Sequence, residues 1–110
     1  MLTGERGHYA LALASLKGAP TKDGLEAIKP TYVGALEAFA NQGLMLSEQV
    51  YDGVGAPLKN PVAAGQGTGS ATTLAWAHAE YIKLLRSVHD RQVWDDYPPV
   101  WALIGHDAKP

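Results

Sequence analysis

The chain has 110 residues, a formal net charge of −2, 46% hydrophobic and 18% charged residues, and no cysteine. This length allows one domain at most, or a piece of one, burying roughly 60–70% of the surface of its unfolded chain. Because the chain has no Lys/Arg run, we expect neither nucleic acid nor a membrane as its partner. Because it has no cysteine, it can form no disulfide, no thiolate zinc site and no Cys nucleophile.

The first predicted helix begins near residues 3–5 and ends at Gly18 and Pro20. Four apolar residues follow the i, i+3, i+4, i+7 spacing of one buried helix face: Tyr9, Ala12, Leu13 and Leu16. Residues 9–16 are apolar enough to compare with a signal peptide, but charges before and after them favour a helix. We therefore expect no signal peptide and a cytoplasmic location, and no apolar run approaches the roughly 20 residues that span a bilayer.

Residues 21–29 predict at most one short helical turn, with Asp23 as a possible cap. Pro30 suits the first turn of a second helix that runs to about Ala40. Its buried face would hold Tyr32, Leu36 and Phe39, with Val33 and Ala40 beside them.

The segment 44–52 (LMLSEQVYD) follows this helix and brings one carboxylate, Glu48, between polar and aromatic neighbours. Residues 52–70 are rich in Gly and Pro and form a loop of a length that usually has a function. Glu48 is therefore our catalytic candidate. The alternative is a solvated or capping Glu at a helix end, as most Glu residues are surface residues.

The third predicted helix spans residues 71–88, with Ser70 as its N-cap. Apolar residues cover most of its circumference and leave a narrow polar stripe of Glu80, Lys83, Ser87 and Asp90. Two other helices are too little protein to cover such a helix, so the chain is expected to be a slice of a larger helical layer structure. The tail, residues 93–104, has Pro98-Pro99 between aromatic residues and predicts an extended strap on the helices.

Three further patterns leave alternatives open. The glycine-rich run 65–70 favours a tight, closely approached turn over a phosphate cradle, because no strand precedes it and no P-loop lysine follows. The histidines lack metal-ligand spacing, so we expect structural roles and no metal. Trp76 is either a core residue or the wall of a site.

Glycoside hydrolysis needs two carboxyl groups, and only Glu48 has a suitable setting.

Five segments of the chain resemble, in order and spacing, the C-terminal part of the bacterial glucoamylase/glucodextranase catalytic domain, glycoside hydrolase family 15. They are residues 2–12 (LTGERGHYALA), 35–41 (ALEAFAN), 46–53 (LSEQVYDG), 67–87 (GTGSATTLAWAHAEYIKLLRS) and 93–95 (VWD). The resemblance implies an all-α fold, a partial α/α toroid cut from a six-hairpin α/α barrel. The chain would supply about three main helices and the C-terminal strap, as the C-terminal part of that domain over residues 1–110, not a complete domain.

The resemblance also implies a function and site residues. Glu48 matches the general base that activates water for inverting, exo-acting hydrolysis of α-glucosides, and Trp76 matches part of the wall around the terminal glucose. Gln49 completes the base motif, and Tyr51 stands where bacterial members usually carry Trp; both are expected to bind substrate. The general acid belongs to motifs absent from this chain, so we expect no independent activity, no cofactor, and as partners an α-glucoside or α-glucan and the missing N-terminal part of the barrel. The alternative is a non-catalytic helical binding or scaffold protein.

Overall fold

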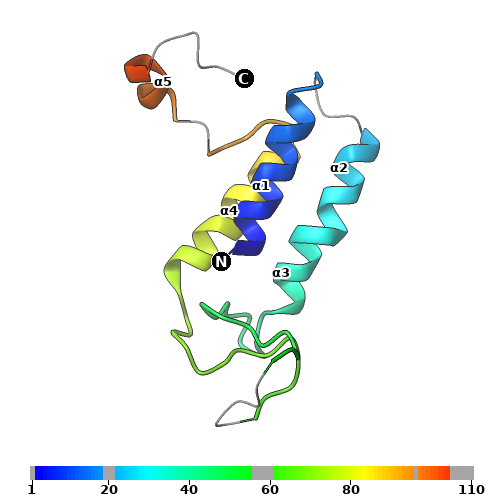
Figure 1. The fold of residues 1–110 in the computed structure, drawn as a ribbon, viewed down its shortest axis with the longest axis vertical. Coiled ribbons are helices and arrows are strands. Elements are labelled where there is room, and N and C mark those ends of the chain that lie inside the picture. The colour runs from blue at the N-terminus through cyan, green and yellow to red at the C-terminus, as the bar shows by residue number, and fades with distance from the viewer. Residues whose placement is uncertain (1, 19–21, 56–60, 96, 105–110) are drawn as a thin grey trace.

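The computed structural model describes residues 2–18, 22–55, 61–95 and 97–104, and these residues form an all-α structure, which confirms the predicted fold class (Figure 1). Helix α1 (Leu2–Ser15) and helix α4 (Ala75–Asp90) lie against a helical rod made of α2 (Lys22–Ile28), η1 (Lys29–Val33) and α3 (Gly34–Ala38). A short helix α5 (Pro98–Ile104) follows in the tail. The long connection between α3 and α4 gathers at the end of the bundle where α1 and α4 begin (Figure 1).

The second predicted helix does not begin at Pro30, because the chain is helical from Lys22 through Ala38. Proline inside an α-helix removes an amide donor and crowds the preceding turn. Here η1 is a π-helical turn, in which the Gly34 amide donates to the Lys29 carbonyl, and the wider turn keeps Pro30 within one continuous rod. The predicted buried face of this rod is confirmed for Leu36 and Val33.

Two glycines allow α1 and α4 to approach each other closely. A Cβ atom at Gly4 would lie 2.9 Å from the Glu80 Cβ, and one at Gly7 would lie 2.7 Å from a methyl group of Leu84. Both distances are shorter than carbon atoms tolerate. The contact between α1 and α4 therefore depends on the absence of side chains at Gly4 and Gly7.

This contact reverses the predicted orientation of α1. Its buried residues are Gly4, Gly7, His8 and Leu11, whereas Tyr9, Leu13 and Leu16, three of the four residues predicted to be buried, are 59%, 44% and 55% exposed. Both sets have the i, i+3, i+4, i+7 spacing of a helix face. The prediction was wrong because it counted apolar side chains, and the tightest packing uses the face with the smallest ones.

The core joins α1, the rod and α4 through seven buried residues: Leu11, Leu25, Ile28, Val33, Leu36, Leu84 and Val88. Tyr81 lies at its edge and donates a hydrogen bond to Glu37, which raises the pKa of the phenol. Helix α4 begins at Ala75, not at residue 71, and Leu74 is its N-cap in place of Ser70. Its predicted polar stripe was wrong in two positions, because Glu80 and Ser87 are buried against α1 and the tail.

The predicted extended strap over residues 93–104 was wrong, because only its start lies along the end of α4 and residues 98–104 are helical. The Trp94 amide donates to the Ser87 hydroxyl, and its indole N–H donates to Asp90 at 2.8 Å. Hydrogen bonds from Arg86, His89 and Trp94 lower the pKa of Asp90 to about 2. Helix α5 then begins at Pro98, because proline suits a first helical turn.

Much apolar surface remains uncovered on the described residues. Leu2, Ile82 and Leu103 are 67%, 63% and 86% exposed, in addition to the outward face of α1. The Cα radius of gyration is 16.1 Å, against about 13 Å for a compact domain of this length. Among the described helices, none has the length and apolar character needed to cross a membrane. Pro20, at the predicted end of the first helix, and the Trp101 side chain, in the predicted strap, lie outside the described residues.

We predict that Gly7→Ala destabilises the fold. The new methyl group would meet the buried Leu84 and would lie 3.1 Å from the Tyr32 Cβ, and overpacking of this kind costs about 1–3 kcal/mol. Thermal unfolding followed by circular dichroism measures the change. Gly34→Ala is the matched control, because its Cβ would meet nothing closer than 3.7 Å. Equal effects of the two substitutions would contradict the close contact.

We also predict that the isolated 110-residue chain is poorly stable and self-associates, since its exposed apolar faces exceed what its own helices cover. Sedimentation should show oligomers, and a dye that binds exposed apolar surface should bind before unfolding. A monomer with a sharp cooperative transition and no dye binding would contradict this expectation.

Candidate functional site

The segment that carries Glu48 begins in a tight loop after α3. The Asn41 side-chain oxygen accepts hydrogen bonds from the amides of Gly43 and Met45 at 2.9 and 3.0 Å. The Met45 carbonyl in turn accepts the Asn41 amide. An Asn side chain that bonds its own following backbone is a common turn device, and it directs residues 46–51 back across the end of the bundle.

Residues 46–51 then pair with residues 65–74 in an irregular antiparallel arrangement. Two isolated bridges join Ser47 to Thr72 and Val50 to Gly67. The Glu48 amide donates to the Ala71 carbonyl at 2.9 Å, and the Tyr51 amide donates to the Gln66 carbonyl at 2.9 Å. The backbone of Glu48 and Tyr51 is thus fixed without regular strands.

Gly67 is required for this pairing. A Cβ atom there would lie 2.3 Å from the Ser47 hydroxyl oxygen, and Ser47 is buried with its hydroxyl 2.8 Å from that of Thr72. The glycine-rich run is therefore a closely approached turn, as predicted. It is not adjacent to the N-terminus of α4, which begins five residues after Ser70.

Glu48, Gln49 and Tyr51 line one open cleft of about 750 Å³. The other lining residues come from the start of α1, the end of α3 and the loop: Leu2, Thr3, Phe39, Val50, Asp52, Ala64, Gly65 and Thr68. The Glu48 side chain is exposed, and among the described residues its carboxylate has no hydrogen-bond or ion-pair partner. A carboxylate free of protein partners at a cleft can accept a proton from a bound water.

Asp52 is a second carboxylate at this cleft, in addition to the predicted Glu48. Its Oδ1 accepts the Val54 amide at 2.9 Å. Asp52 thus supports the turn that leaves the cleft.

His78 anchors the cleft segment to α4. Its Nε2 accepts a hydrogen bond from the Leu46 amide at 3.0 Å, and the Leu74 amide donates to the Leu46 carbonyl at 3.1 Å. A ring nitrogen that accepts must be unprotonated. The expected structural role of this histidine is confirmed.

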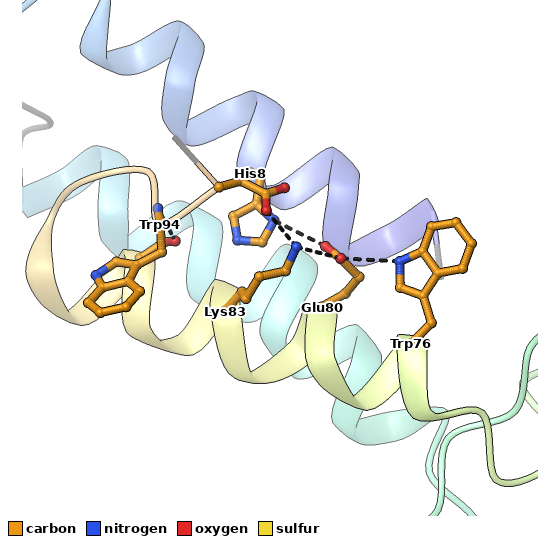
Figure 2. A network of polar contacts seen from close by, with 7 residues as sticks. His8, Trp76, Glu80, Lys83 and Trp94 are labelled. Carbon is orange, nitrogen blue, oxygen red and sulfur yellow. Dashed lines mark hydrogen bonds and ion pairs between the residues drawn. The ribbon is translucent and has the colours of Figure 1, made fainter. Parts of the chain in front are cut away.

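Trp76 is not among the residues that line the cleft. It lies in the first turn of α4 and is 53% exposed, so it is not a core residue. Its indole N–H donates to Glu80 Oε1 at 3.2 Å, as Figure 2 shows. The structure therefore brings together three of the four predicted site residues at the cleft, and Trp76 is not one of its lining residues.

A buried polar network surrounds Glu80 (Figure 2). Lys83 Nζ lies 2.6 Å from Glu80 Oε1 and 2.5 Å from Asp95 Oδ1, and His8 Nδ1 lies 3.6 Å from Glu80 Oε2. Partial burial lowers the pKa of Lys83, but hydrogen bonds to Asp95 and Glu80 outweigh it, so the pKa is raised overall. The ammonium neutralises charge that would otherwise be buried unpaired.

His8, Glu80 and Asp95 each place a ligand atom within 4.8 Å of the others. Lys83 contacts both carboxylates of this group, so a cation is already present, and the group does not fit a metal ion well. Sequence reasoning missed the network because it assigned Glu80 and Lys83 to solvent. The i, i+4 spacing of Trp76 and Glu80 was the available signal.

Comparison with known proteins shows that the chain is similar in sequence to a curated relative. A glucoamylase from Clostridium sp. (strain G0005) is 39% identical over 95 residues, which is 86% of this chain. The chain spans about one tenth of the length of that relative, since the match covers 10% of it. No family model matches the chain, and no solved structure matches it. The chain is therefore similar to a segment of this glucoamylase.

We predict that His78→Ala loosens the cleft segment. Loss of the acceptor for the Leu46 amide should cost about 1–2 kcal/mol and speed exchange of that amide roughly 5–30-fold, as measured by NMR hydrogen exchange. His78→Gln, which offers an oxygen near the position of Nε2, should restore most of the protection. His89→Ala is the matched control on the same helix, because His89 pairs only with Asp90 among the described residues. Unchanged Leu46 exchange in His78→Ala would contradict this role.

Proposed function

We propose that this chain is a segment of an inverting, exo-acting α-glucosidase of the glucoamylase/glucodextranase type, glycoside hydrolase family 15, and that Glu48 is its general base. The observation that carries the proposal is the meeting of Glu48, Gln49 and Tyr51 at one cleft in a chain that is 39% identical to a glucoamylase over 95 residues. The substrate class is an α-glucoside or α-glucan.

The geometry suits the base half of the reaction. An inverting glycosidase uses one carboxylate to deprotonate the attacking water and a second carboxyl group to protonate the leaving oxygen. Glu48 offers an exposed carboxylate on a backbone held by hydrogen bonds to residues 66–74. Polar Gln49 and aromatic Tyr51 lie beside it at the cleft, and an aromatic ring can pack on the apolar face of a sugar.

In this proposal the general acid comes from a part of the protein outside residues 1–110. Within these residues the other carboxylate at the cleft, Asp52, bonds to its own turn, and the sequence has no match to the general-acid motif. The uncovered apolar faces of α1 and α4 are then surfaces for the remaining helices of a six-hairpin α/α barrel. Residues 1–110 form the C-terminal part of that domain, and the N-terminal part is the partner.

A second candidate is a non-catalytic helical binding or scaffold protein. The exposed apolar residues favour it equally, because they would serve an interface with any partner. Neighbouring coding sequence separates the two proposals: an upstream frame with the acid motif supports the glycosidase.

We predict that the isolated chain releases no glucose from maltose or isomaltose, because a base without the opposite acid stabilises too little of the transition state. Residues 1–110 grafted into a full-length homologue should support turnover, and Glu48→Gln should reduce kcat by roughly 10²–10⁴-fold with sugar binding largely retained.

Glu26→Gln is the matched control for the graft, since Glu26 is an exposed carboxylate on α2 that does not line the cleft. It should leave kcat unchanged. Near-parental kcat in Glu48→Gln would show that Glu48 is not the base, and glucose release by the ungrafted chain would show that the site is already complete.

A further inference from the structure

Trp76 combines an exposed ring with an immobilised polar edge. The residue is 53% exposed, yet its indole N–H is bonded to Glu80, which is only 5% exposed. A tryptophan that only fills a core would be buried. An exposed ring with a fixed orientation instead suits a stacking surface, because little conformational freedom is lost when a ligand binds.

The place of Trp76 connects it to the cleft. Two residues before it, the Leu74 amide donates to the carbonyl of Leu46, which lies two residues before Glu48. The first turn of α1 contacts both the cleft and Glu80: Leu2 and Thr3 line the cleft, and Gly4 packs on Glu80, the hydrogen-bond partner of Trp76. Trp76 is thus linked to the cleft through the Leu74–Leu46 hydrogen bond and the first turn of α1, and Figure 2 shows its indole N–H directed at Glu80.

Glu80 is itself held in one position. Its Oε1 accepts from Trp76 and pairs with Lys83 at 2.6 Å, and Asp95 of the tail holds Lys83 from the other side. Gly4 of α1 packs closely against Glu80, since a Cβ atom at Gly4 would lie 2.9 Å from the Glu80 Cβ. A buried carboxylate without such partners would be strongly unfavourable, so Lys83 is what permits an acceptor at this depth.

We propose that Glu80 is a positioning residue that fixes the Trp76 ring as a preformed wall of the sugar site, with Lys83 and Asp95 holding the carboxylate. The identity of the ligand rests on the function proposed above, but the fixing of the ring does not. The competing explanation is that Glu80 only joins α1 to α4 and that its bond to Trp76 has no effect on a ligand.

The first test uses the 110-residue chain, below the concentration at which it self-associates, and follows the indole N–H signals of its tryptophans by NMR, with Trp76→Phe for assignment. Glu80→Ala should shift the Trp76 signal and speed its exchange with water roughly 5–10-fold, as expected for one lost hydrogen bond. Glu80→Gln keeps an acceptor oxygen and should retain the signal, which guards against an effect of misfolding. Asp90→Ala is the matched control, since Asp90 accepts the indole of Trp94; it should move the Trp94 signal and leave that of Trp76 unchanged.

The second test measures KM and kcat for maltose in the grafted domain. Glu80→Ala should raise KM about 5–10-fold, the equivalent of one hydrogen bond's contribution to ligand affinity, and Glu80→Gln should restore most of it. On a Trp76→Phe background Glu80→Ala should add little, because a residue that acts through another is not additive with it.

The outcomes separate the two proposals. An unmoved Trp76 indole signal in Glu80→Ala, or additive effects of the two substitutions on KM, would overturn the positioning role. A graft without maltose turnover would overturn the proposed function instead, and the indole signals would then decide the positioning role alone.

Discussion

The structure depends on the close approach of α1 and α4, which Gly4 and Gly7 permit. Because the two helices touch along their backbones, His8 and Glu80 are buried between them rather than exposed. A buried carboxylate needs a partner, and Lys83 supplies the charge. The buried network thus results from the absence of side chains at Gly4 and Gly7. The same close contact determines which face of α1 remains exposed.

The same close packing organises the end of the bundle at which the cleft lies. Both α1 and α4 begin there (Figure 1), so the first turn of α1 lines the cleft while the first turn of α4 carries Trp76 and His78. His78 then holds the segment that carries Glu48 through the Leu46 amide. Rigid helices thus position an irregular segment, which is a common arrangement for functional residues in proteins.

The exposure of the large apolar residues of α1 follows from the same contact between α1 and α4. Once the small-residue face of α1 packs on α4, its large apolar residues point away from the core. A chain that folded alone would be expected to bury them, because exposed apolar patches of this kind mark interaction surfaces. In the larger helical domain proposed above, the remaining helices would bury these residues.

The sequence by itself determined the all-α class and the approximate places of three helices, because apolar periodicity and turn residues are local signals. Glu48, Gln49 and Tyr51 are neighbours in the chain, and the structure places all three at one cleft. Tertiary structure alone decided the buried face of α1, the burial of Glu80 and the unbroken rod through Pro30. Two faces of α1 share one helical spacing, and only contact with α4 selects between them. Likewise Glu80 has the composition of a solvated residue until Lys83 and Trp76 are brought to its carboxylate by the fold.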